Sequence, residues 1–297
     1  MTRNRFFISV VAVLLAVLSA CSGGGVSRQV IAVTIPPVRA WAEELAGDRF
    51  DVLCVVPDGG NPESFDLPPS TMARLAECPA YFSCGYLGFE RAWLGKIALN
   101  NPQMQVVNMA EGIELIYGTH HHHGEEAEAH DADEHDACYP DPHLWCSPRR
   151  ARLMVRNMYE ALCRLDPDGR AVYDENYSRL DARMALLDST LTARLAPDAG
   201  RAFAIYHPTL TYWAADYGVH QLALEPEGKS PSPQYLRQMV DSARHCGVEV
   251  VFVQREFDPK QAETFSREVG CRTEIINPLS YAWESESLHI ADAFDRK

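Results

Sequence analysis

The sequence lacks several patterns that mark common enzyme classes and nucleic-acid-binding proteins. It has no HExxH segment, no Gly-x-Ser-x-Gly turn and no phosphate-binding loop. Lysine and arginine number 27 against 41 aspartates and glutamates, a net charge of −14, so the basic face that nucleic acid requires is not supplied. The nine cysteines include no CxxC pair, which disfavours a thiolate zinc cluster and leaves any disulfide pairing open.

Long apolar runs are also scarce beyond the amino terminus. Two arginines precede the apolar residues 6–18, and Leu18-Ser19-Ala20-Cys21 resembles a bacterial lipobox. We therefore predict a signal peptide over residues 1–20, an acylated Cys21 and a flexible tether over residues 21–28. An ordinary signal peptide with a coincidental cysteine is the alternative. The protein should be exported, periplasmic or at the cell surface, and held by lipid to a bacterial membrane.

What the sequence does contain is a regular alternation of short β-branched runs and helical patterns, as in stacked βα units. At 297 residues with 46% hydrophobic side chains, two domains can each bury a core. We predict an α/β fold of two doubly wound parallel-sheet lobes, an N-terminal lobe over 29–167 and a C-terminal lobe over 198–297. The predicted strands are 30–35, 52–56, 80–84 and 105–107 in the first lobe, and 202–206, 219–224, 250–254 and 274–276 in the second.

One long helix is predicted between the lobes, over residues 168–197. Its apolar residues recur at steps of three or four, and Pro167 and Pro197 set its limits. A helix of this length spans roughly 40 Å at 1.5 Å per residue. It should restrain the two lobes from hinging widely.

An acidic, histidine-rich segment at residues 120–136 stands out because it has no aliphatic side chain larger than alanine. It cannot build a core, so we predict a solvated loop that binds borderline metal ions weakly and without fixed geometry. A merely acidic linker is the other interpretation. The histidines of this loop are His120, His121, His122, His123, His130 and His135.

Two further histidines have the setting of a fixed site. His143 lies in Asp141-Pro142-His143-Leu144-Trp145, immediately before a predicted helix start, and His207 follows the buried strand 202–206 and precedes a proline. Loops at the carboxyl ends of parallel strands are where ligands bind in open α/β sheets. Either histidine alone would more often be structural, but one from each half beside a histidine-rich segment favours metal binding.

At these residues the sequence resembles a known superfamily, the ZnuA-like and TroA-like metal-binding lipoproteins of zinc and manganese ABC importers. Its Asp-Pro-His-x-Trp motif is matched at 141–145 and its His-Pro turn at 207–208, followed by an aromatic-rich helix and Tyr217-Gly218. Its Glu-Gly-Lys-x-Pro-Ser segment is matched at 227–232. The resemblance covers nearly all of the mature chain, and an acidic histidine-rich loop is typical of the zinc-specific members.

Two positions depart from the commoner family pattern. Glu63 stands where many members have a metal-binding histidine, and Asn277 stands where many have an aspartate. The resemblance therefore implies a metal site of Glu63, His143, His207 and Asn277. Two imidazoles and one carboxylate suit Zn²⁺ better than Mn²⁺, which would be helped by a second carboxylate.

The resemblance implies a monomeric solute-binding lipoprotein that captures Zn²⁺ between its lobes. It would deliver the ion to a membrane permease driven by a cytoplasmic ATPase. Two alternatives use the same residues. A His₂Glu zinc site with an open position also describes a metal-dependent hydrolase, and a surface adhesin or metal buffer cannot be separated by residues alone.

Overall fold

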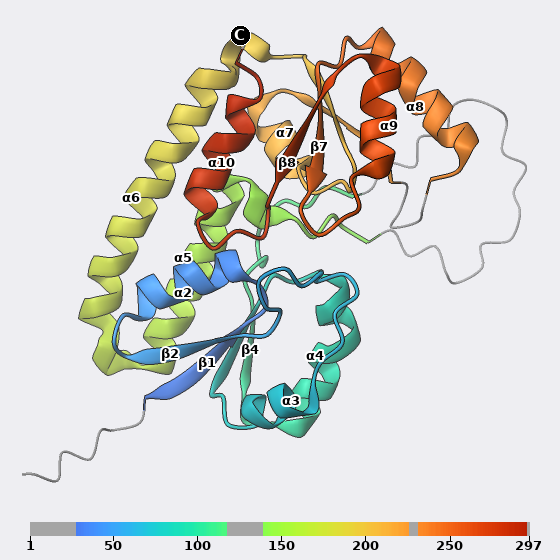
Figure 1. Ribbon diagram of the computed structural model, residues 1–297. Helices are drawn as coiled ribbons and strands as arrows, with labels where there is room; N and C mark the ends of the chain where they lie inside the picture. Colours follow the sequence, from blue (N-terminus) through green and yellow to red (C-terminus); the bar gives the residue numbers. More distant parts are fainter. Residues whose placement is uncertain (1–27, 118–138, 226–230, 296–297) are drawn as a thin grey trace, which may run out of the picture.

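The computed structural model describes residues 28–117, 139–225 and 231–295, and two four-stranded parallel sheets organise it (Figure 1). The strand orders are β2-β1-β3-β4 and β6-β5-β7-β8, so the two sheets repeat one pattern. The strands of the first sheet are β1 (Gln29–Val33), β2 (Phe50–Cys54), β3 (Ala80–Ser83) and β4 (Gln105–Asn108). Those of the second are β5 (Ala202–Ile205), β6 (His220–Ala223), β7 (Val250–Gln254) and β8 (Arg272–Ile276).

The strand order creates one switch point in each sheet. The chain passes from the first strand outward to one edge and then returns to the first strand's other side, so β1 pairs with both β2 and β3, and β5 pairs with both β6 and β7. Ligands bind in open α/β sheets outside the carboxyl ends of the strands at such a point. In both lobes these ends point toward the middle of the molecule (Figure 1).

Helices pack against both sheets. Those of the first half are α2 (Pro36–Ala46), α3 (Pro69–Leu75), α4 (Gly88–Asn100), the 3-10 turn η1 (Leu144–Cys146) and α5 (Pro148–Leu165). Those of the second half are α7 (Thr211–Tyr217), α8 (Pro233–His245), α9 (Lys260–Val269) and α10 (Trp283–Asp292). Among the described residues, no helix combines the length and the apolar character needed to cross a membrane.

Helix α6 (Arg170–Leu195) lies along one side of both lobes (Figure 1). Its buried residues form the predicted stripe, from Tyr173 through Leu180 and Leu187 to Leu195. It packs on α5 and α2 and on α10 of the second lobe. The helix therefore gives both lobes one continuous wall.

The predicted fold is confirmed: all eight predicted strands exist, with ends that agree within two residues, and the long helix lies inside its predicted range. Ser147 caps α5 and Ser232 caps α8, because each hydroxyl accepts a backbone N–H of the first turn. Pro259, rather than Asp258, precedes α9, and the Asp258 carboxylate accepts the Lys260 N–H from just outside the helix. Every cysteine in the described part of the chain is a free thiol.

Candidate metal centre

A small pocket lies between the lobes at the carboxyl ends of the sheets, and both halves of the chain line it. Its lining residues are Asn61, Pro62, Glu63, His143, Trp145, His207, Thr209, Glu256, Phe257, Pro278 and Leu279. Three of the four predicted ligands are therefore brought together, from segments far apart in the sequence. Asn277 is not among the lining residues, although the next two residues are.

His207 is held at the pocket by three neighbours. Its Nδ1 lies 2.5 Å from a carboxylate oxygen of Glu225, and its backbone N–H and carbonyl are both bonded by the Gln254 amide. Phe257 stacks on the ring at 5.4 Å between centroids. The Nε2 atom is buried and has no hydrogen-bond partner among the described residues. Because Nδ1–H donates to the carboxylate, Nε2 carries the lone pair that a metal ion requires.

His143 repeats this arrangement on a different scaffold. Its Nδ1 lies 2.9 Å from Oδ1 of Asp141, and its backbone N–H donates to the same oxygen. It is the residue immediately before η1, and Trp145 of that turn donates its indole N–H to the carbonyl of Pro278. The Asp141 carboxylate thus selects the tautomer in which Nε2 is free to ligate. The hydrogen bond of Trp145 also ties this turn to the second lobe.

The two imidazoles are neighbours. Their ring centroids are 5.3 Å apart and the ring planes cross at 81°. Burial by itself lowers the pKa of His143, but the carboxylate of Asp141, with those of Glu63 and Glu256, outweighs burial and leaves that pKa above its usual value. Burial raises the pKa of Asp141, and the charge and hydrogen bonds of His143 more than reverse this, so the Asp141 carboxylate is favoured. The pocket is an environment that favours positive charge.

The Glu63 carboxylate lies at the first-lobe wall of the pocket. Its Oε2 accepts the backbone N–H of Gly88, at the start of α4, at 3.2 Å. The Asn61 side chain accepts the N–H of Glu63 and so shapes this loop. A side chain at position 88 would place its Cβ 2.6 Å from Oε2 and 2.9 Å from the carbonyl of Glu63, so the close approach requires glycine.

Glu256 is a pocket residue that sequence reasoning missed. It follows β7, the strand beside β5, and burial raises its pKa. The sequence could have indicated this residue, because Glu256 follows a predicted buried strand just as His207 does. The predicted ligand Asn277 instead donates its backbone N–H to Glu286. Within the described ranges, no three histidine, cysteine, aspartate or glutamate side chains lie close enough together to hold an ion in this structure.

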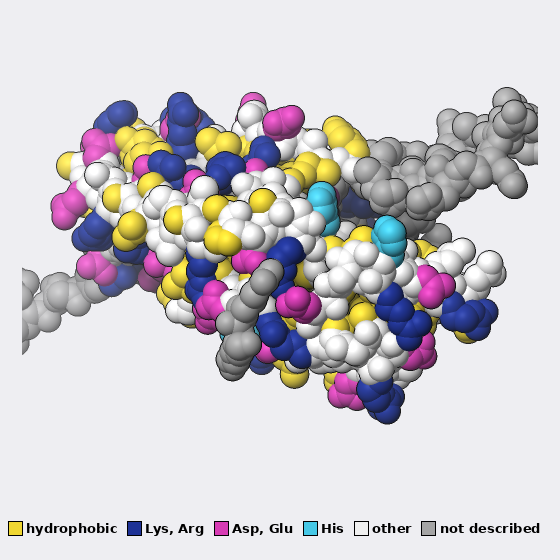
Figure 2. Space-filling model, turned by 90° about the horizontal axis from the view of Figure 1, so that it is seen from above, with side chains coloured by type: hydrophobic (Ala, Val, Ile, Leu, Met, Phe, Trp, Pro, Cys, Tyr) yellow, Lys and Arg dark blue, Asp and Glu magenta, His cyan; other side chains and the backbone are white. Residues whose placement is uncertain are grey.

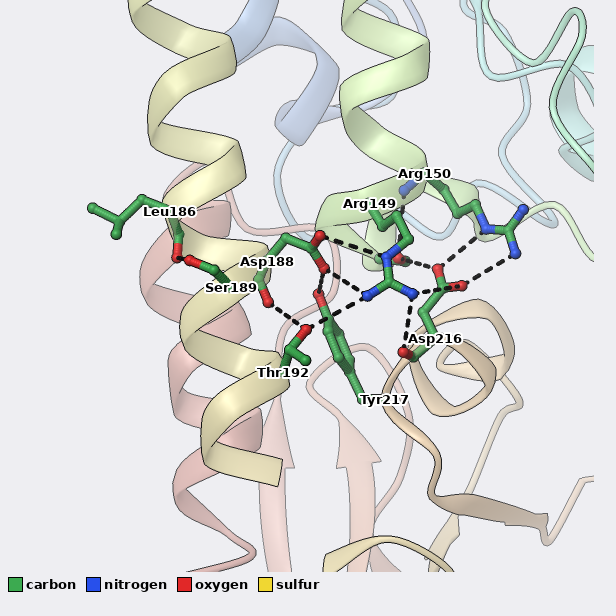
Figure 3. Close-up of polar contacts among 9 residues, drawn as sticks. Arg149, Arg150, Leu186, Asp188, Ser189, Thr192, Asp216 and Tyr217 are labelled. Atoms are coloured by element: carbon green, nitrogen blue, oxygen red, sulfur yellow. Dashed lines mark hydrogen bonds and ion pairs between the residues drawn. The ribbon is translucent and has the colours of Figure 1, made fainter. Parts of the chain in front are cut away.

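A polar network behind the pocket ties together the helices that follow the two histidines (Figure 3). At the start of α5, Arg150 pairs with both oxygens of Asp216 on α7 at 3.1 Å, and Ser147 donates to the same carboxylate at 2.6 Å. Asp188 of α6 accepts hydrogen bonds from Arg149 and from Tyr217. This network joins α5, which follows His143, to α7, which follows His207.

The predicted lipidation residue Cys21 and the histidine-rich loop 120–136 lie outside the described residues. On the face shown in Figure 2, acidic and basic side chains lie interspersed rather than in patches of one sign. The ion pairs of the described surface mix the two signs as well, since most join partly exposed arginines to neighbouring carboxylates. The pocket that both halves line is therefore the candidate site.

Comparisons with known proteins bear on the family and the fold of this chain. The model of a family described as ZnuA, zinc-uptake complex component A, periplasmic, matches residues 31–289. The chain belongs to the ZnuA family. That family consists of extracytoplasmic components of metal uptake systems and is not an enzyme family. The predicted superfamily is thereby confirmed.

Individual relatives show how far the similarity extends. The high-affinity zinc uptake system protein ZnuA of Bacillus subtilis is 24% identical over 255 residues, which are 84% of this chain and 78% of that protein. The zinc-binding lipoprotein AdcA of Streptococcus pneumoniae is 23% identical over 86% of this chain, and the chain spans about half of its length (51%). A solved ZnuA deletion mutant with zinc bound superposes with a TM-score of 0.79 at 30% identity, covering 91% of this chain and all of that one.

Proposed function

We propose that this ZnuA family member captures Zn²⁺ in the pocket between its lobes and delivers it to a membrane permease driven by a cytoplasmic ATPase. His143, His207 and Glu63 are the proposed ligands, and Asn277 stays the fourth predicted ligand. The ion is cargo, so the protein binds and releases it without chemical change. We expect no catalytic turnover, and zinc-loaded protein incubated with ester, peptide and lactam substrates tests this.

One observation carries the proposal. Among the described residues, the buried Nε2 atom of His207 has no hydrogen-bond partner, and it lies beside the ring of His143. The Nδ1 atom of each histidine is bonded to a carboxylate. A buried polar atom that lacks a hydrogen bond costs free energy, and a metal ion removes that cost. Carboxylate–histidine–zinc arrangements of this kind orient the imidazole and raise its basicity.

The preference for zinc follows from the donors. Two imidazoles and a carboxylate suit the short tetrahedral bonds of Zn²⁺, and relatives named for zinc support the choice. We also propose that Cys21 carries a lipid anchor and that the protein acts as a monomer. The histidine-rich loop is proposed to bind metal weakly. The name of the lipoprotein AdcA supports the lipid anchor.

Calorimetry with a His207→Ala variant tests the site. We expect the one tight zinc equivalent to disappear, because the ion loses a ligand that the fold holds in place. His220→Ala is the matched control, since His220 is exposed at the start of β6, the far end of the same sheet from the pocket. Retention of tight binding by His207→Ala would disprove the proposed site.

Deletion of residues 120–136 tests the second part of the proposal. The weak zinc equivalents should vanish while the tight equivalent remains, because the loop supplies histidines without fixed geometry. Loss of the tight equivalent as well would show that the loop itself forms the site.

A further inference from the structure

The strand order places Glu256 beside His207. Strand β7 pairs with β5 in parallel register, with Ile205 opposite Phe252, so the loops that follow the two strands leave the sheet side by side. Gln254, the last residue of β7, bonds both the N–H and the carbonyl of His207. Two residues later, Glu256 lies in the pocket wall. His207 and Glu256 thus occupy the switch point of the second sheet.

Contacts on both sides hold the backbone of Glu256 at this place. Arg255 donates its backbone N–H to Ile276 of β8, and its guanidinium lies 3.6 Å from the carboxylate of Asp58 in the first lobe. Phe257 donates its N–H to Gln254 and stacks its ring on His207. The carboxylate between them therefore reaches the pocket from a loop with little freedom to withdraw.

The charges of the pocket supply the second argument. Two neutral imidazoles and Glu63 leave one positive charge of a divalent ion uncompensated, and Asn277 offers only a neutral carbonyl oxygen. A buried charge without compensation is costly. Glu256 and Glu63 together supply two negative charges, and both residues line the pocket with His143.

Resting on the proposed function, we propose that the Glu256 carboxylate is itself a zinc ligand and takes the fourth position in place of Asn277. The site then consists of two imidazoles and two carboxylates, one pair from each side of the cleft. It neutralises the ion completely. Because hard oxygen donors favour Mn²⁺, the second carboxylate also makes the pocket more tolerant of Mn²⁺ than a histidine-richer site.

A charge-removing variant tests this assignment. Glu256→Gln should raise the Kd for Zn²⁺ at least tenfold, since loss of even an outer partner of a ligand costs roughly 10–100-fold. It should raise the Kd for Mn²⁺ by a larger factor. Glu263→Gln, an exposed position on α9 of the same lobe, removes the same charge and should change neither Kd by more than about twofold. If Asn277→Ala raises the Kd for Zn²⁺ and Glu256→Gln does not, Asn277 rather than Glu256 is the fourth ligand.

Folding and direct contact are checked separately. Urea unfolding of the metal-free proteins should show that Glu256→Gln is folded, and a crystal of the zinc-loaded protein should place a Glu256 oxygen about 2.0–2.2 Å from the ion. If Glu256→Gln binds zinc as wild type while His207→Ala does not, the assignment of Glu256 is wrong and the proposed function survives. If His143→Ala and His207→Ala also bind as wild type, the proposed function itself is wrong.

Discussion

The two sides of the interface between the lobes differ in the contacts that they make: aromatic packing and ion pairs lie on one side, and two neighbouring imidazoles lie on the other. On the side away from the pocket, Trp41 of α2 packs edge-on against Trp283 of α10 at 5.6 Å. Arg183 of α6 bonds Glu44 of the first lobe at 2.6 Å and Glu284 of the second at 3.0 Å. On the pocket side, the imidazole nitrogen of His207 is buried and unpaired among the described residues.

This difference separates stability from binding. Aromatic packing and ion pairs on the far side join the two lobes without an ion. On the pocket side, the buried Nε2 atom of His207 costs free energy while it has no hydrogen bond. Ligation removes that cost and so favours binding of the ion. Since α6 packs on both lobes and should restrain wide hinging, we expect the carboxylates of the pocket loops to make the movements that complete the site. The following variants test this division, beginning with the largest expected effect.

Removing the tryptophan contact should damage stability and spare binding. Trp41→Ala should lower the free energy of unfolding by about 3–5 kcal/mol, because a fully buried indole leaves a cavity. Urea unfolding measures the loss, and calorimetry on the folded protein should give a zinc Kd within about twofold of wild type. Trp93→Ala, at a half-buried position on α4, is the control and should cost less. A large change in Kd for Trp41→Ala would contradict the division.

The first lobe should show a pH-dependent stability that originates on the pocket side, at Glu90. Burial raises the pKa of this carboxyl to about 7, although hydrogen bonds from Thr34, Cys84 and Gly85 oppose the shift. The unfolded chain releases the proton near pH 4.5 and the folded chain only near 7, so folding retains the proton in between. The free energy of unfolding should therefore fall by on the order of 3 kcal/mol as pH rises from about 4.5 to 7. Above pH 7 it should stay level.

Urea unfolding of the metal-free protein at several pH values measures this slope. Comparison with Glu90→Gln isolates it, because the amide cannot ionise and other carboxylates titrate equally in both proteins. Equal slopes in the two proteins would show that the Glu90 carboxyl is ionised in the fold throughout this range.

The carboxylates behind the histidines should matter for binding and little for stability. Glu225→Gln should raise the Kd for Zn²⁺ by roughly 10–100-fold, because an amide can donate to Nδ1 of His207 and so move the ring proton onto the ligating nitrogen. Glu249→Gln, an exposed residue that precedes β7 at the opposite end of the sheet, should leave the Kd unchanged. Calorimetry with both variants compares them, and equal affinities would remove Glu225 from the site.

The smallest effect is expected at the arginine that bridges the lobes. Arg183→Ala should lower the free energy of unfolding by about 1 kcal/mol or less, since its side chain is 42% exposed and solvent screens both ion pairs. Urea unfolding in low and high salt checks this, because the difference from wild type should shrink as salt is added. A loss as large as that of Trp41→Ala would mean that charge rather than packing joins the lobes.

Local patterns were enough to predict most of the fold. Strands such as 250–254 and the helix stripe of α6 are legible because side-chain periodicity follows from backbone geometry alone. His143 and His207 were predicted as site residues because each occupies a loop at an expected position. Glu63 came from the family resemblance and also lies in the pocket.

Sequence alone thus determined the elements, their order along the chain and the two imidazoles, since each depends on neighbours within a few residues. The tertiary structure alone decided which carboxylates meet those imidazoles. Glu256 lines the pocket because β7 lies next to β5, and Asn277 does not although the two residues after it do. Strand neighbours depend on how the crossovers pack, and no local pattern records that choice.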